Sequence, residues 1–170
     1  MKTIKVIIFL SLLPLSYLLA QVSDPKLIPE SLELMKGKWT GSGWIQAGPG
    51  PRQIFNHNEH VYSKLDGQLL ILNGEARDTE TAKVTFQAFG VVKAKSDTTF
   101  QVSTYTLEGR HTIADAKIEN RKFIWWFEAG NGATIRYEIA LTDDTWTEEG
   151  YYIPSPDQRF HMFHMELKRL

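Results

Sequence analysis

Histidine is the residue type in this chain that could bind a metal ion or a haem iron. His57 and His60 are three residues apart, and so are His161 and His164, in segments whose side chains alternate like those of β-strands. Residues three apart on a regular strand point to opposite faces, so neither pair can chelate one ion without a bulge. We therefore expect no compact zinc site. The fifth histidine, His111, lies in a predicted turn.

Four glutamates could provide acid–base chemistry. Glu128, Glu138, Glu148 and Glu149 lie on successive predicted strands, and a pair of carboxylates can act on a glycosidic bond. Evenly spaced acids on antiparallel strands are more typical of a solvated outer face, and we interpret these four in that way.

The sequence motifs of common enzymes are not found. Ser42, Ser63 and Ser103 lie outside any Gly-x-Ser-x-Gly motif, and no Gly-x-x-x-x-Gly-Lys-Ser/Thr loop is present. The chain has no cysteine, which excludes a thiolate nucleophile, a thiolate metal site and a disulfide. We expect that the protein is not an enzyme.

Composition narrows the class of partner. The chain of 170 residues carries 19 basic and 20 acidic side chains, for a net charge of −1. No basic field favours nucleic acid. The length is sufficient for one domain with its own core, and the sequence gives no oligomeric state.

Residues 1–20 have the layout of a secretory signal peptide. Lys2 and Lys5 supply positive charge, residues 6–20 are almost wholly apolar, and Ala20 is a small residue at a plausible cleavage point. The alternative is a membrane anchor, but Pro14 interrupts the run, which is short for a hydrocarbon core of about 30 Å. Export without cysteine suits a bacterial periplasm or exterior. We predict a periplasmic or secreted protein without stable membrane insertion after cleavage.

The remaining chain must position any functional side chain on strands. Residues 21–36 read as a linker and a short helix, with Pro29 suited to a first helical position. Residues 37–170 contain about ten strand-like runs separated by turn sequences such as Asp66-Gly67. Short connections make neighbouring strands antiparallel, and a meander this long should close to remove its edges. The predicted fold is all-β, a single antiparallel up-and-down β-barrel of about ten strands with a short N-terminal helix.

The inner face of this barrel is read from the aromatic run at residues 123–127. Phe123, Trp125 and Phe127 share one face by alternation. A symmetric register across the turn at 130–132 places Trp125 opposite Tyr137 and Trp126 opposite Arg136. We expect the first face to be interior, although a slip of one residue reverses it.

The second predicted strand has two mixed faces. Asn56, Asn58, His60 and Tyr62 share one face, and hydrophobic residues share the other with polar ones, namely Gln53, Phe55, His57, Glu59, Val61, Ser63 and Leu65. A barrel that holds water and a ligand need not alternate cleanly, and a curled, bulged strand gives the same pattern.

Both ends of the barrel segment carry a family resemblance. Gly37-Lys38-Trp39 opens the first strand, and further glycines at 41 and 43 let it curl. Gly-x-Trp at this place resembles the lipocalin-like (calycin) barrels, in which a basic residue near the chain end packs over the tryptophan. The resemblance implies that Arg169, with Lys168 as its rival, covers Trp39 at the closed end. Such a contact contributes about 0.5–2 kcal/mol.

The number of strands indicates which kinds of lipocalin-like barrel the chain resembles. About ten strands, without a disulfide or a long C-terminal helix, are similar to small bacterial lipocalin-like domains and to nitrobindin-type and fatty-acid-binding-protein-type barrels. The nitrobindin likeness implies an alternative function, haem binding with His164 as axial ligand and Met162 on the same face.

The function expected from these observations is non-catalytic binding of a small, mostly apolar molecule in the barrel cavity, without a cofactor. Aromatic residues are the candidates for the lining: Trp44, Trp125, Phe127, Tyr137 and Trp146. Arg52 and Arg136 would meet a carboxylate head group if they point inward. Besides haem, a structural or partner-binding role for a filled barrel remains as an alternative.

Overall fold

The structure is a computed structural model and describes residues 27–170. The predicted signal peptide, residues 1–20, lies outside the described residues. Within residues 27–170, no helix is long and apolar enough to cross a membrane. The expected N-terminal helix is a short 3-10 helix, η1 (Glu30–Met35).

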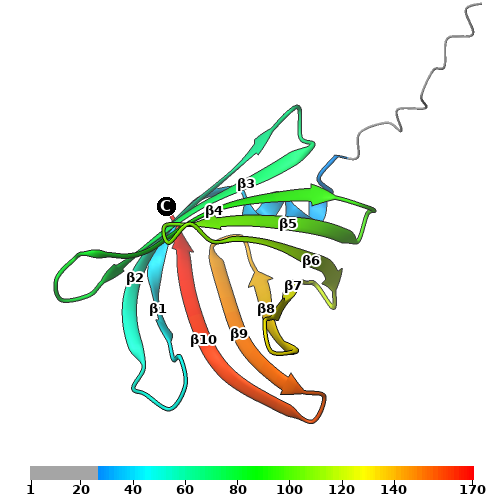
Figure 1. Cartoon of the computed structure of the whole chain (residues 1–170). Helices are drawn as coiled ribbons and strands as arrows, with labels where there is room; N and C mark the ends of the chain where they lie inside the picture. Colours follow the sequence, from blue (N-terminus) through cyan, green and yellow to red (C-terminus); the bar gives the residue numbers. More distant parts are fainter. Residues whose placement is uncertain (1–26) are drawn as a thin grey trace, which may run out of the picture.

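The fold is a closed antiparallel up-and-down barrel, as predicted (Figure 1). Each strand pairs with the next along the chain, and the last pairs with the first. The strands are β1 (Gly37–Ile45), β2 (Gln53–Lys64), β3 (Leu69–Asp78), β4 (Val84–Ala94), β5 (Thr99–Thr106), β6 (His111–Glu119), β7 (Lys122–Ala129), β8 (Ala133–Leu141), β9 (Thr145–Ser155) and β10 (Gln158–Arg169).

The predicted register of β7 and β8 is confirmed. Trp125 lies opposite Tyr137 and Trp126 opposite Arg136. Phe123 is buried in the core, and Trp125 and Phe127 pack against that core from the same face of β7. This face is therefore the inner face of the barrel.

One end of the barrel is tightly packed. Leu32 and Met35 of η1 are buried beneath the strands together with Trp39 and Trp146, whose rings meet edge to face at 5.8 Å. The Trp39 indole N–H donates to the backbone carbonyl of Met35 at 2.9 Å. We call this the closed end.

Arg169 covers Trp39 at the closed end. Its guanidinium carbon lies 4.0 Å from the centroid of the Trp39 ring, the geometry expected from the sequence. The guanidinium also donates to the backbone carbonyls of Leu34 and Lys36, which ties η1 to the end of β10. Lys168, the rival candidate, instead donates to the Thr145 hydroxyl.

The opposite end is more open. Strands β6 and β7 are paired from Glu119 and Lys122 to Asp115 and Trp126, and beyond this point they part. A surface pocket of about 500 Å³ lies there, lined in part by Ile113, Trp126 and Phe127.

A bulge in β10 changes the direction of one histidine. His161 pairs with Tyr151, whereas Phe163 pairs with Gly150, so Met162 is an extra residue on β10. His161 and His164 therefore lie on the same outer face, and the expectation that they point to opposite faces is wrong.

Candidate functional site

The inner face toward the open end is lined by stacked aromatic rings. Trp125 stacks on Tyr137 with a centroid distance of 4.4 Å and an interplanar angle of 13°. Phe127 stacks on Trp125 at 5.9 Å. From the other side, Phe163 meets Tyr137 edge to face at 5.6 Å and stacks on Phe55 at 5.8 Å. These side chains come from alternate positions of their strands, which is why they share one face.

Gly150 lets two of these rings lie against the barrel wall. A Cβ at this position would lie 2.7 Å from Phe163 Cβ and 2.8 Å from the Tyr137 ring. Contacts this short are not tolerated, so only glycine leaves room for both side chains. The aromatic wall therefore depends on the absence of a side chain at this position of β9.

Two polar side chains of β2 enter the interior beside the aromatic wall. His57 Nε2 lies 2.9 Å from Glu59 Oε2, and the two side chains are only 8% and 9% exposed. Both lie against Gly74 of β3, where a Cβ would come within 2.5 Å of Glu59 Oε2. The other carboxylate oxygen, Glu59 Oε1, is buried and has no hydrogen-bond partner.

A second carboxylate, Glu148, reaches the interior from β9. Its oxygen Oε2 accepts a hydrogen bond from the Trp146 indole N–H at 3.3 Å, and the residue is 8% exposed. Burial, and after it the negative charge of Glu59, raise the pKa of Glu148 to about 7. Hydrogen bonds from Trp146 and Trp125 act against this rise. Burial and the nearby Glu148 also raise the pKa of the Tyr137 hydroxyl.

These residues form a site that we call the interior acid site: His57, Glu59, Tyr137 and Glu148, with the indoles of Trp125 and Trp146. Two buried carboxylates can accept hydrogen bonds or bind a cation. A carboxyl group with a pKa near neutrality can also exchange a proton at physiological pH. Within residues 27–170, no group of three His, Cys, Asp or Glu side chains is arranged to hold a metal ion.

The structure brings only part of the predicted lining together. Trp125, Phe127 and Tyr137 line the interior toward the open end. Trp146 is interior but belongs to the closed end, where it is 1% exposed against Trp39.

Trp44 lies on the outer face, contrary to the prediction. It is five residues after the buried Trp39, and an odd separation on a strand reverses the face. Arg52 is also outside, with its guanidinium carbon 3.6 Å from the Trp44 ring centroid.

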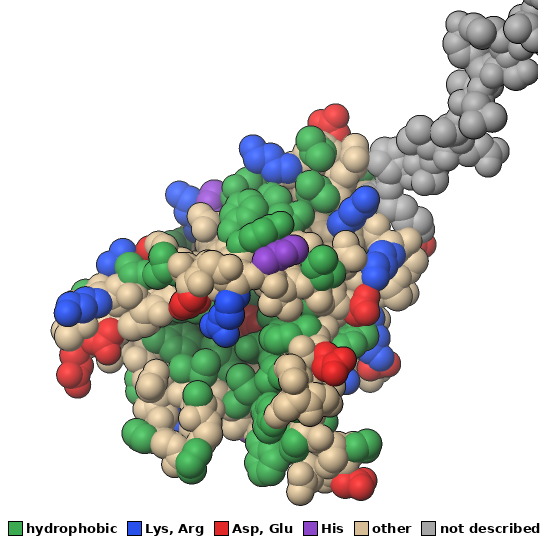
Figure 2. All heavy atoms as spheres, viewed as in Figure 1, with side chains coloured by type: hydrophobic (Ala, Val, Ile, Leu, Met, Phe, Trp, Pro, Cys, Tyr) green, Lys and Arg blue, Asp and Glu red, His purple; other side chains and the backbone are tan. Residues whose placement is uncertain are grey.

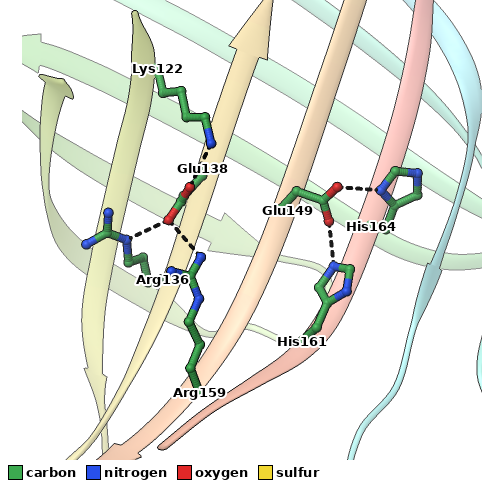
Figure 3. A network of polar contacts seen from close by, with 7 residues as sticks. All are labelled: Lys122, Arg136, Glu138, Glu149, Arg159, His161 and His164. Carbon is green, nitrogen blue, oxygen red and sulfur yellow. Dashed lines mark hydrogen bonds and ion pairs between the residues drawn. The ribbon is translucent and has the colours of Figure 1, made fainter. Parts of the chain in front are cut away.

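Arg136 and His164 lie on the outer face of the sheet as well. Figure 3 shows Glu138 with Lys122, Arg136 and Arg159, and Glu149 between His161 and His164. Neither predicted arginine can meet a carboxylate head group inside the barrel. His164 Nδ1 lies 2.9 Å from Glu149 Oε1, and its ring cannot be the axial ligand of a haem in the interior.

The interior acid site was not predicted from the sequence. Glu148 was assigned to a solvated outer face, which is wrong. Glu128, Glu138 and Glu149 do lie on the outer face, but Glu138 is only 9% exposed there, so it is not solvated. Strand alternation could have placed Glu148 inside the barrel, because Glu148 is two residues after Trp146, which was predicted to be interior. His57 and Glu59 were placed with Phe55 and Val61, so their common face was correct.

The comparisons with known proteins concern the fold. No protein-family model and no curated protein matches the sequence. The crystal structure of Rv2717c from M. tuberculosis is similar, with a TM-score of 0.67 and 9% identity over 84% of this chain and 99% of that chain. The S-type phycobiliprotein lyase CPES from Guillardia theta is similar at a TM-score of 0.59 and 8% identity, over 85% of this chain and 92% of that chain. At these identities the likeness extends to the barrel fold alone.

Proposed function

We propose that the protein binds a small, mostly apolar molecule in the open half of the barrel, without catalysing a reaction. The observation that carries this proposal is the difference between the two halves of the inner face. Trp39 and Trp146 at the closed end are at most 1% exposed, whereas Trp125, Phe127 and Phe163 toward the open end are only partly buried. In the space-filling view, hydrophobic side chains surround a hollow in the face that is drawn (Figure 2).

A ligand that covers these aromatic rings removes apolar surface from water, which favours binding. Burial of apolar surface contributes about 25 cal/mol per Å². The rings are held by stacking on one another and by the close approach at Gly150, so little side-chain entropy is lost on binding. A preformed apolar wall with a few polar groups is the usual composition of a small-molecule site. A barrel of similar fold is a phycobiliprotein lyase, so enzymes also use this fold.

Binding without catalysis is supported by the state of an interior hydroxyl group. The buried hydroxyl of Ser63 has no hydrogen-bond partner. A serine or threonine nucleophile needs an adjacent base to activate it. We interpret the interior carboxylates as ligand-binding groups.

The neutral naphthalene dye prodan tests the proposal. We expect its fluorescence to rise on binding, with energy transfer that quenches tryptophan emission, because Trp125 lines the site. Phe127→Ala should weaken binding about five-fold, the equivalent of roughly 1 kcal/mol of lost aromatic contact. Phe89→Ala, at a residue 41% exposed on the outer face, is the matched control and should have no effect.

Two results of the prodan experiment would contradict the proposal, each in a different way. If prodan does not bind, the barrel is filled and a structural or partner-binding role replaces our proposal. If Phe89→Ala weakens binding and Phe127→Ala does not, the dye binds to the outer surface, and the proposed site is wrong.

A further inference from the structure

Two carboxylates, Glu59 and Glu148, lie inside the barrel, opposite in charge to the arginine anchors expected from the sequence. In the part of the chain that the structure describes, neither Glu59 nor Glu148 forms an ion pair with a lysine or arginine. The only charged contact of Glu59 is with His57, and Glu148 accepts hydrogen bonds from indole groups. A ligand that ends in a carboxylate would bring a third negative charge to this site.

One carboxylate oxygen lacks a donor. Glu59 Oε1 is buried without a hydrogen-bond partner, although its side chain is only 9% exposed and its other oxygen is bound by His57. A buried acceptor without a donor is unfavourable, and a charged one more so. The negative charge of Glu59 also acts on Glu148, so both groups are close enough to influence one another. The interior therefore has a place for a donor that no residue of the described chain supplies.

We propose that the ligand carries a protonated amine at its inner end, bound by Glu59 and Glu148. This inference rests on the proposed function, since it assigns a polar end to the apolar molecule bound there. An ammonium group supplies up to three donors and a positive charge, which satisfies Glu59 Oε1 and offsets the repulsion between the two carboxylates. A hydroxyl group has one donor and no charge, and can satisfy only one of them.

The aromatic wall fits the same ligand. Trp125 and Tyr137 are stacked beside Glu148, and Trp125 donates a hydrogen bond to it. The faces of indole and phenol rings attract cations, and aromatic rings beside acids are a usual arrangement for binding ammonium groups. The apolar part of the ligand would then lie along Phe127 and Phe163 toward the open end.

The affinity for an amine should depend on pH. The groups that face Glu148 are Glu59 and Tyr137, with His57 on Glu59, and the positive charge of Arg110 acts on Tyr137. Because the pKa of Glu148 is raised to about 7, this carboxylate is largely protonated at pH 5 and ionised at pH 8. A cationic ligand should therefore bind more tightly at pH 8, and a neutral ligand should not.

Competition for bound prodan tests this with three ligands that share one aromatic body: naphthylmethylamine, naphthylmethanol and naphthoate. We expect the amine to compete about ten-fold better than the alcohol at pH 8, as charge-assisted hydrogen bonds do, and the carboxylate to compete least. The preference for the amine should shrink at pH 5. This part of the experiment needs only the wild-type protein.

Substitutions test whether the preference for the amine arises from Glu59 and Glu148. Glu59→Gln and Glu148→Gln keep the side-chain size and should each reduce the preference for the amine several-fold while prodan still binds. Glu166→Gln changes an outer-face carboxylate that is 53% exposed and should leave the preference unchanged.

Two results would overturn the inference. If prodan binds but the alcohol or the carboxylate competes as well as the amine, the inference fails and the proposed function stands. If neither prodan nor any of the three naphthyl compounds binds, the proposed function fails, and the inference fails with it.

Discussion

Glu148 has a carboxyl group whose pKa departs strongly from that of the free amino acid. It lies inside the barrel at 8% exposure, and burial together with the negative charge of Glu59 raises its pKa from 4.5 to about 7. The folded protein therefore retains a proton that the unfolded chain releases as the pH rises above 4.5. The stability gained from this proton is fully present below pH 4.5 and is lost as the pH rises to about 7.

Glu148→Gln should remove this pH dependence. Relative to wild type, the variant should gain up to about 3 kcal/mol in free energy of unfolding between pH 4.5 and 8, because its amide does not ionise. Urea unfolding of both proteins at several pH values measures the difference. Glu166→Gln on the outer face is the control, with a difference that stays constant. Parallel curves for Glu148→Gln and wild type would show that the carboxyl group titrates normally.

Trp39 and Arg169 should be energetically coupled. Trp39→Ala removes a fully buried indole and should lower the free energy of unfolding by about 3–5 kcal/mol. Arg169→Ala should cost less, and Lys168→Ala, at an exposed neighbour, about 0.5 kcal/mol or less. A double-mutant cycle from chemical denaturation measures the coupling. If the losses at Trp39 and Arg169 simply add, the contact contributes nothing to stability.

Single residues could be assigned to the inner or outer face of the barrel wherever the face of a neighbouring residue on the same strand was already predicted. Phe123, Trp125 and Tyr137 were placed correctly for this reason. Trp44 was chosen as a large aromatic residue, although its distance of five residues from Trp39 already excluded the inner face. Glu148 was misplaced because charge was given more weight than alternation.

At the level of the strand, the bulge in β10 decides what the C-terminal histidines can do. Residue types do not reveal where a strand gains an extra residue, so alternation placed His161 and His164 on opposite faces. In the structure Met162 is the extra residue, and both rings reach Glu149 on the outside of the barrel. Neither ring is available to a ligand in the interior.

Haem binding through His164 is therefore not expected. Haem iron in a barrel needs an axial donor on the inner face, and the only imidazole of residues 27–170 in the interior acid site is His57, which is paired with Glu59. Titration of the purified protein with haemin should give no sharp Soret band that His164→Ala abolishes. A stoichiometric band that is lost in His164→Ala and kept in His161→Ala would contradict this prediction.

The aromatic wall should be sensitive to one methyl group on β9. Gly150→Ala places a Cβ against Phe163 and Tyr137, and overpacking of this kind costs about 1–3 kcal/mol. Thermal unfolding measures the loss, and prodan should bind less well because the rings are displaced. Gly130→Ala, in an open turn with no atom within 4 Å of the new Cβ, is the matched control. Equal unfolding temperatures for both variants would mean that the wall can shift without loss.

For the whole molecule, the spacing of turns was enough to predict the barrel. Strands at about ten-residue intervals with short connections leave few topologies other than a closed meander, and the closed end followed from Trp39 and Arg169. The polarity of the interior could not be predicted in the same way. It depends on side chains of β2 and β9, which are far apart in sequence and meet only when the barrel closes.

The extent of the folded unit bears on the predicted export of the protein. The described contacts of the barrel begin at Ile28, whose N–H donates to the carbonyl of Gly67 at 2.8 Å. A mature chain that starts at Gln21 retains every one of these contacts. N-terminal sequencing of periplasmic or secreted material should begin at Gln21, and Ala20→Lys should block processing. Recovery of intact Met1 in the membrane fraction of the wild type would show that the segment is an anchor instead.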